Sequence, residues 1–150
     1  LGHFPLERDG RPCTCGNRGC LEQYASTTAL VRLACQATGE ASLNGREIFA
    51  RAARKDPTML RVLAAWTADV AAGVTGLVHV FNPEMVLIGG GVSAQEALFL
   101  SPLRERVLAQ VMPCFATGLR VERAALGNDA GLVGAATVKP APRSFCCAQR

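Results

Sequence analysis

The chain has 150 residues, of which 49% are hydrophobic, 5% aromatic and 19% charged, and its formal net charge is +4. This length suits one domain with a proper core, which excludes a disordered or fibrous protein and favours a cytoplasmic α/β protein. The basic residues form no Lys/Arg block, so neither nucleic-acid nor membrane-surface binding is predicted for this segment.

The first segment, residues 2–22, is called the cysteine loop here. It is rich in Gly, Asn, Arg, Thr and Pro, which favour turns over regular structure. One histidine and three cysteines stand close together in it: His3, Cys13, Cys15 and Cys20. Three thiolates and one imidazole suit a tetrahedral zinc ion, and metal binding would stabilise a loop too polar to bury a core. The sequence therefore predicts a structural zinc site.

Two other interpretations of these cysteines are weaker. The chain has seven cysteines, an odd number, and no secretory signal opens it, which argues against a disulfide framework. A bond between Cys13 and Cys15 would also close a small, strained ring. Thiols buried as small apolar side chains fit poorly with neighbours as polar as Thr14, Asn17 and Arg18.

The cysteine loop also carries a resemblance to a known family. Its pattern resembles the signature of the ROK family of sugar kinases and sugar-responsive repressors, here Gly2-His3 followed by Cys13-Thr-Cys15-Gly16-Asn-Arg-Gly19-Cys20-Leu-Glu22. The next four residues, Gln23 to Ser26, are similar to those of bacterial glucokinases of that family. The resemblance covers residues 1–138. It implies the C-terminal lobe of an actin-like, ribonuclease H-like ATPase fold.

Three helices are predicted after the loop, over residues 24–38, 45–54 and 57–81. Asp56-Pro57 is a typical helix start. The long third helix has an apolar stripe and a second face of small residues, which predicts packing on more than one side. A membrane span over residues 62–81 is disfavoured, because Asp69 would cost about 2.5–3.5 kcal/mol at the bilayer centre. His79 on this helix is expected to be a hydrogen-bonded core residue.

A strand over residues 84–88 follows. Its apolar run suits an interior parallel strand covered on both faces. Gly89, Gly90 and Gly91 come next. A strand that leads through glycines into a helix lets backbone amides approach a nucleotide, although such glycines also serve plain turns. The resemblance implies that this segment binds the adenosine of a nucleotide.

The remaining elements are a helix over residues 102–111, an edge strand over 119–124 and a helix over 129–138. The last helix is made of small apolar residues, which predicts tight packing against the sheet. Asp129 is expected to cap it and not to act as a catalytic base. Residues 139–150 lack periodicity and are predicted to be a disordered tail.

The resemblance implies that His3 and Glu22 bind sugar hydroxyls and that His3 also binds zinc. It further implies an ATP-dependent hexose kinase, with glucose as the first candidate sugar, Mg²⁺ bound with ATP, and a homodimer. The family's Asp-x-Gly-x-Thr phosphate loop and catalytic Asn-Asp have no match here, so no catalytic residue is assigned. We expect a fragment that is inactive alone. A sugar-sensing transcriptional repressor and a zinc-stabilised interaction module are the alternatives.

Overall fold

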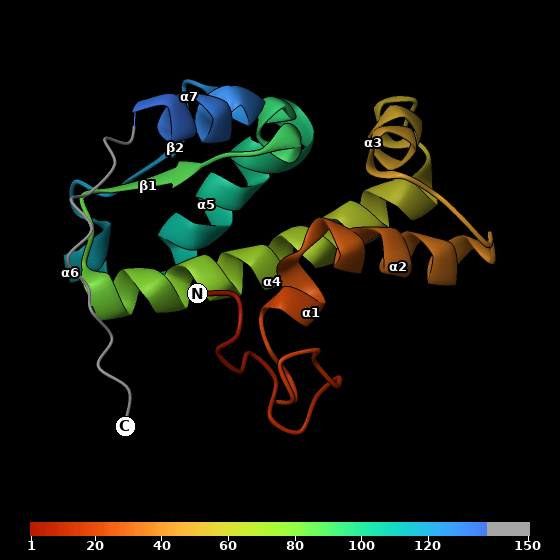
Figure 1. Ribbon diagram of the computed structural model, residues 1–150, viewed down its shortest axis with the longest axis horizontal. Coiled ribbons are helices and arrows are strands. Elements are labelled where there is room, and N and C mark those ends of the chain that lie inside the picture. The colour runs from red at the N-terminus through yellow and green to blue at the C-terminus, as the bar shows by residue number, and fades with distance from the viewer. Residues whose placement is uncertain (138–150) are drawn as a thin grey trace.

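The computed structural model describes residues 1–137 (Figure 1). Its helices are α1 (Glu22–Ala25), α2 (Thr27–Thr38), α3 (Gly45–Ala53), α4 (Pro57–Phe81), α5 (Ser101–Gln110), α6 (Pro113–Ala116) and α7 (Ala130–Thr137), and its strands are β1 (Met85–Ile88) and β2 (Arg120–Arg123). Short 3₁₀ segments lie at Gly91–Ala94 (η1) and Gly127–Asp129 (η3), and a π-helical turn, η2, lies at Glu96–Leu100. The predicted α/β class is confirmed. The predicted tail, 139–150, lies outside the described residues.

The long helix α4 is the central element, and its bounds are those predicted. The carboxylate of Asp56 accepts hydrogen bonds from the backbone N–H groups of Thr58 (2.8 Å) and Met59 (3.2 Å), which caps the helix beside Pro57. Helices α1, α2, α3 and α5 all contact α4, as Figure 1 shows. By length and composition alone, helix α4 is apolar enough to cross a membrane, but nine of its residues, Trp66 among them, are buried within the fold. His79 accepts a hydrogen bond from the Met112 N–H at 3.2 Å, as predicted, but it is half-buried and not part of the core.

The core is centred on Trp66 of α4. Its ring lies 4.7 Å from that of Phe99, centroid to centroid, and both side chains are buried. The indole N–H donates to the carbonyl oxygen of Ser26 at 3.1 Å. Ser26 is extended, with ψ 161°, and its hydroxyl accepts from the Ala29 N–H. The predicted helix over 24–38 is therefore two helices, because Ser26 caps α2 instead of continuing α1.

The sheet has two parallel strands within residues 1–137, with Val86 of β1 opposite Val121 of β2. Val121 and Leu119 are buried against the core. Leu87 is 59% exposed on the other face. The prediction that β1 is covered on both faces is therefore not met within the described part of the chain.

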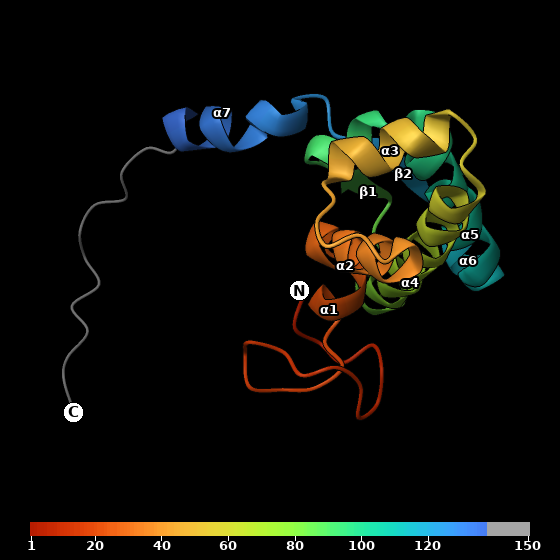
Figure 2. The ribbon, with the colours of Figure 1, turned by 90° about the vertical axis from the view of Figure 1, so that its right-hand side faces the viewer.

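The C-terminal helices differ most from expectation. A π-helical turn, η2, leads directly into α5, and the short helix α6 follows α5 where only a helix end was predicted. Helix α7 extends away from the other helices in Figure 2. Leu132 and Val133 on α7 are 74% and 41% exposed, so the predicted tight packing against the sheet is wrong here. A helix that is apolar on every side gives no orientation from its sequence pattern.

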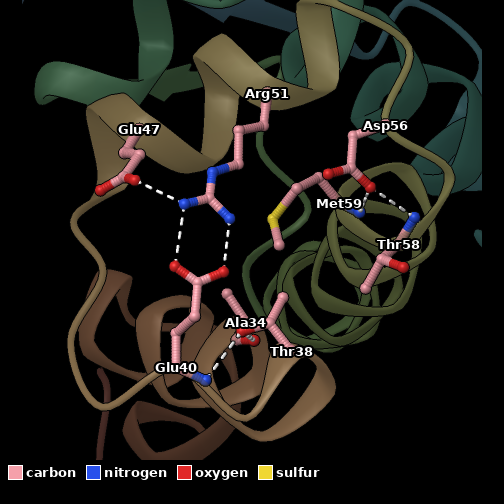
Figure 3. A network of polar contacts seen from close by, with 8 residues as sticks. All are labelled: Ala34, Thr38, Glu40, Glu47, Arg51, Asp56, Thr58 and Met59. Carbon is pink, nitrogen blue, oxygen red and sulfur yellow. Dashed lines mark hydrogen bonds and ion pairs between the residues drawn. The ribbon is translucent and has the colours of Figure 1, made fainter.

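Helix α3 is fixed to the end of α2 by a polar network (Figure 3). Arg51 donates to Glu40 through both terminal nitrogens, with Nη2–Oε2 at 2.8 Å, and to Glu47 at 2.7 Å. The amide oxygen of Asn44 accepts from the Glu47 N–H at 3.0 Å and caps α3. These bonds connect α3 to the residues after α2 and cap its first turn.

Candidate functional site

The cysteine loop is closed by backbone hydrogen bonds between its two ends. The N–H groups of Leu21 and Glu22 donate to the carbonyl oxygens of Phe4 (2.9 Å) and Gly2 (2.8 Å). Inside the loop, the Gly19 N–H donates to the Arg11 carbonyl oxygen at 2.8 Å. Gly19 has φ +71°, and a Cβ on it would lie 1.7 Å from the carbonyl oxygen of Glu7. Only glycine fits at this position.

Tyr24 of α1 fixes the middle of the loop from outside. Its phenolic oxygen accepts a hydrogen bond from the Arg11 N–H at 2.9 Å, and the Arg11 guanidinium lies 5.9 Å from the ring centroid. A Cβ on Gly10 would lie 2.2 Å from the same oxygen. The sequence prediction missed this contact. The only feature of the sequence that could have indicated this contact is an aromatic residue next to the cysteine motif.

The predicted metal ligands come together in the folded loop. The ligand atoms of His3, Cys13, Cys15 and Cys20 all lie within 4.8 Å of one another. The Cys13 Sγ lies 3.5 Å from the His3 Nδ1, and the Cys15 and Cys20 sulfurs lie 3.6 Å apart. A tetrahedral zinc ion places such ligand atoms roughly 3.5–3.8 Å apart, given its usual bond lengths. The donor set and its spacing fit zinc.

The two buried thiols of the cluster have opposite pKa shifts. A hydrogen bond from the Cys15 backbone N–H is the main cause that lowers the pKa of Cys13 to about 6. Burial raises the pKa of Cys20 to about 12. The protein alone therefore does not hold both sulfurs as thiolates at neutral pH, whereas a bound divalent cation would.

Glu22 lies beside this cluster. Its carboxylate oxygen Oε2 lies 2.9 Å from the position that a Cβ would occupy on Gly2, the neighbour of His3. The side chains of His3 and Glu22 are both exposed. The fold thus brings the two predicted sugar-binding residues to one exposed place at the start of α1.

The three predicted nucleotide-binding glycines lie elsewhere: Gly89 and Gly90 connect β1 to η1, and Gly91 begins η1. Figures 1 and 2 show the cysteine loop on the side of α4 away from the sheet. Gly90 has φ +83°, which favours glycine, and the Ser93 hydroxyl donates to its carbonyl oxygen at 2.8 Å. Of the three glycines, Gly91 lines a groove whose other wall is the first turn of α3. The sequence prediction did not include that second wall.

The described fold is thus an α/β arrangement built on one long helix, with a Cys/His cluster beside Glu22. Residues 1–141 match the ROK family, and the chain belongs to that family. The resemblance seen in the sequence is confirmed.

Three relatives illustrate the likeness. The glucokinase of Thermotoga maritima is 35% identical over 92% of this chain and 48% of its own length. The solved structure of a ROK family glucokinase from Streptomyces griseus, in complex with glucose and AMPPNP, has a TM-score of 0.81 and 34% identity over 90% of this chain and 49% of that one. The xylose repressor of Bacillus subtilis is 28% identical over 92% of this chain and 35% of the repressor. The chain spans about half the length of the curated glucokinases it matches.

Proposed function

We propose that this chain is the C-terminal part of a cytoplasmic, homodimeric, ATP-dependent hexose kinase that uses glucose. The observation that carries the proposal is the packing of the His3–Cys13–Cys15–Cys20 cluster beside Glu22. The likeness to glucokinases of Thermotoga maritima and Streptomyces griseus supports the activity, since the second is described with glucose and AMPPNP.

The cluster has a structural role in this proposal. Zinc would be held by His3 Nδ1 and by the sulfurs of Cys13, Cys15 and Cys20, and four protein ligands leave no open position for chemistry. The other ring nitrogen of His3 stays available for a sugar hydroxyl. The Glu22 carboxylate accepts hydrogen bonds from neighbouring hydroxyls, which orients the sugar.

The nucleotide is assigned to the turn after β1, where Gly89, Gly90 and Gly91 leave the backbone open to adenosine. Phosphoryl transfer also needs a phosphate cradle with Mg²⁺ and a base for the sugar hydroxyl. No motif in these 150 residues supplies either, so the parent protein's other half has to provide them.

Zinc content and glucose binding test the proposal together. We expect one zinc per chain by elemental analysis, lost in Cys13→Ser but kept in Cys35→Ser, whose sulfur lies outside the cluster. Glu22→Gln should keep zinc and its unfolding temperature, yet lose glucose binding at least tenfold by calorimetry. Unchanged glucose binding in Glu22→Gln, or a wild-type chain without zinc, would overturn the proposal.

A second candidate is the sugar-sensing domain of a ROK repressor, which the likeness to the xylose repressor favours. Both candidates use the same cysteine loop and sugar site. The sequence that precedes this segment in the parent gene decides between them. A helix-turn-helix would establish the repressor, and an Asp-x-Gly-x-Thr loop the kinase.

A further inference from the structure

A small pocket of about 170 Å³ opens between α4 and the segment formed by η2 and α5, which lies against α4 in Figure 1. One wall consists of Leu60, Leu63, Ala64 and Thr67 of α4, and the other consists of Ala97, Leu98, Pro102 and Arg106. An apolar cavity of about 150 Å³ can hold benzene, so this pocket has room for one ligand of that size. Neither the cysteine loop nor the turn after β1 contributes to its lining.

The wall opposite α4 has an unusual backbone. Ala97 and Leu98 belong to η2, the π-helical turn that leads directly into α5. Such turns are rare in proteins and occur frequently at functional sites. Pro102, in the first turn of α5, adds a rigid ring to the same wall. This wall therefore combines a rare backbone geometry with apolar side chains.

Thr67 on the α4 wall has a hydroxyl without a hydrogen-bond partner among residues 1–137. The residue is only 1% exposed, and a buried polar group usually has a partner. Thr38 and Thr137, which also lie on helices, donate to the carbonyl oxygen four residues earlier at 3.0 and 2.9 Å. The Thr67 hydroxyl makes no such bond to its own helix, so it remains available to a ligand.

Arg106 is the one charged residue in the lining of this pocket. It is half-buried and makes no ion pair within the described part of the chain. Arg104, two residues earlier on α5, is instead paired with Glu96 and Glu122. Arg106 therefore leaves a positive charge at the pocket without an acidic partner, which favours an anionic group on the ligand.

We propose that this pocket binds a short-chain monocarboxylate of the size of butyrate. Its carboxylate bonds to the planar Arg106 guanidinium, and its alkyl chain contacts the leucines of both walls. The Thr67 hydroxyl donates to the bound carboxylate, since a helical threonine has two favoured χ1 rotamers and can turn toward a ligand. The lining has too few polar groups for a hexose and too little room for a nucleotide. The site is therefore separate from both sites of the proposed function.

The test titrates the full 150-residue chain with sodium butyrate and, separately, with butyramide, its uncharged counterpart, and follows the backbone amide signals by NMR. We expect the signals of Leu63, Leu98 and Arg106 to shift with butyrate and to saturate at roughly millimolar concentration, as is usual for so small a ligand. Signals of the cysteine loop should not move. Arg106→Gln should weaken butyrate binding at least fivefold and leave butyramide binding unchanged.

Thr67→Val separates a binding role from a structural one. Removal of an unpartnered buried hydroxyl should raise the unfolding temperature of the free protein, yet weaken butyrate binding about threefold. Arg61→Gln is the matched control, because Arg61 is an exposed arginine of α4 outside the pocket lining, and it should leave binding unchanged. The proposal is overturned if butyrate shifts no signal of the pocket, if Arg106→Gln and Arg61→Gln weaken binding equally, or if butyramide binds as tightly as butyrate.

Discussion

Gly19 is the residue on which closure of the cysteine loop depends. We predict that Gly19→Ala abolishes zinc binding, because its Cβ would overlap the Glu7 carbonyl oxygen and its φ is +71°. Gly16→Ala is the matched change: its φ is +90° but its Cβ would meet nothing, so it should cost only the left-handed strain of roughly 1–2 kcal/mol. Elemental analysis and thermal unfolding measure both effects. Full zinc content in Gly19→Ala would contradict the prediction.

Individual site residues could be predicted where their spacing along the sequence is enough to indicate their chemical role. The cluster of His3 with Cys13, Cys15 and Cys20 could be predicted because polar loop residues leave few other roles for four such donors. The Tyr24 contact with Arg11 could not, since it depends on how α1 turns back on the loop. The groove that Arg46 and Gly91 line could not be predicted either, because only the packing of α3 brings these two residues to one place.

At the scale of elements, the ion pairs between α2 and α3 give a pH prediction. Hydrogen bonds from Arg51 hold the pKa of the Glu40 carboxyl below its usual range. The pair therefore stabilises the fold above the ordinary carboxyl pKa, and this contribution is lost as the pH falls through the lowered value.

Arg51→Gln should accordingly lower the unfolding temperature at pH 7, and the difference from wild type should shrink as the pH falls below the ordinary Glu pKa of about 4.3. Arg54→Gln, an exposed change without an ion pair within residues 1–137, should have little effect at either pH. Thermal unfolding by circular dichroism checks both. If the difference in unfolding temperature between wild type and Arg51→Gln grows in acid, the ion pair with Glu40 is not the source of the stabilisation by Arg51.

Helix boundaries followed the sequence where a capping side chain and proline coincide, as Asp56-Pro57 does for α4. The cap at Ser26 also agrees with the sequence, but the residues before it form the separate short helix α1 and are not part of one helix over residues 24–38, because a serine near a helix start can either continue the preceding helix or cap the next one. Strand β1 was located by its apolar run and β2 by the alternation of its side chains. Which face of the sheet is covered by other elements could not be predicted, since Leu87 and Leu132 are apolar yet exposed in the described part of the chain.

At the scale of the whole molecule, we predict that the chain has no kinase activity of its own. It spans about half the length of the glucokinases it matches, and it has no motif for a phosphate cradle or a catalytic base. A coupled assay should detect no sugar-dependent ADP release, while the full-length Thermotoga maritima glucokinase serves as the positive control. Sugar-dependent ADP release by the purified chain would refute the prediction.

The chain has one tyrosine and one tryptophan, and the fold separates them. The Tyr24 hydroxyl is hydrogen-bonded to the cysteine loop, whereas Trp66 of α4 is buried against the ring of Phe99. Each aromatic ring is therefore an intrinsic optical probe of one part of the molecule. Ultraviolet absorbance of tyrosine reports the opening of the loop, and tryptophan emission reports exposure of the core. A chelator that changes the first signal before the second would reveal local unravelling that precedes global unfolding, without any added label.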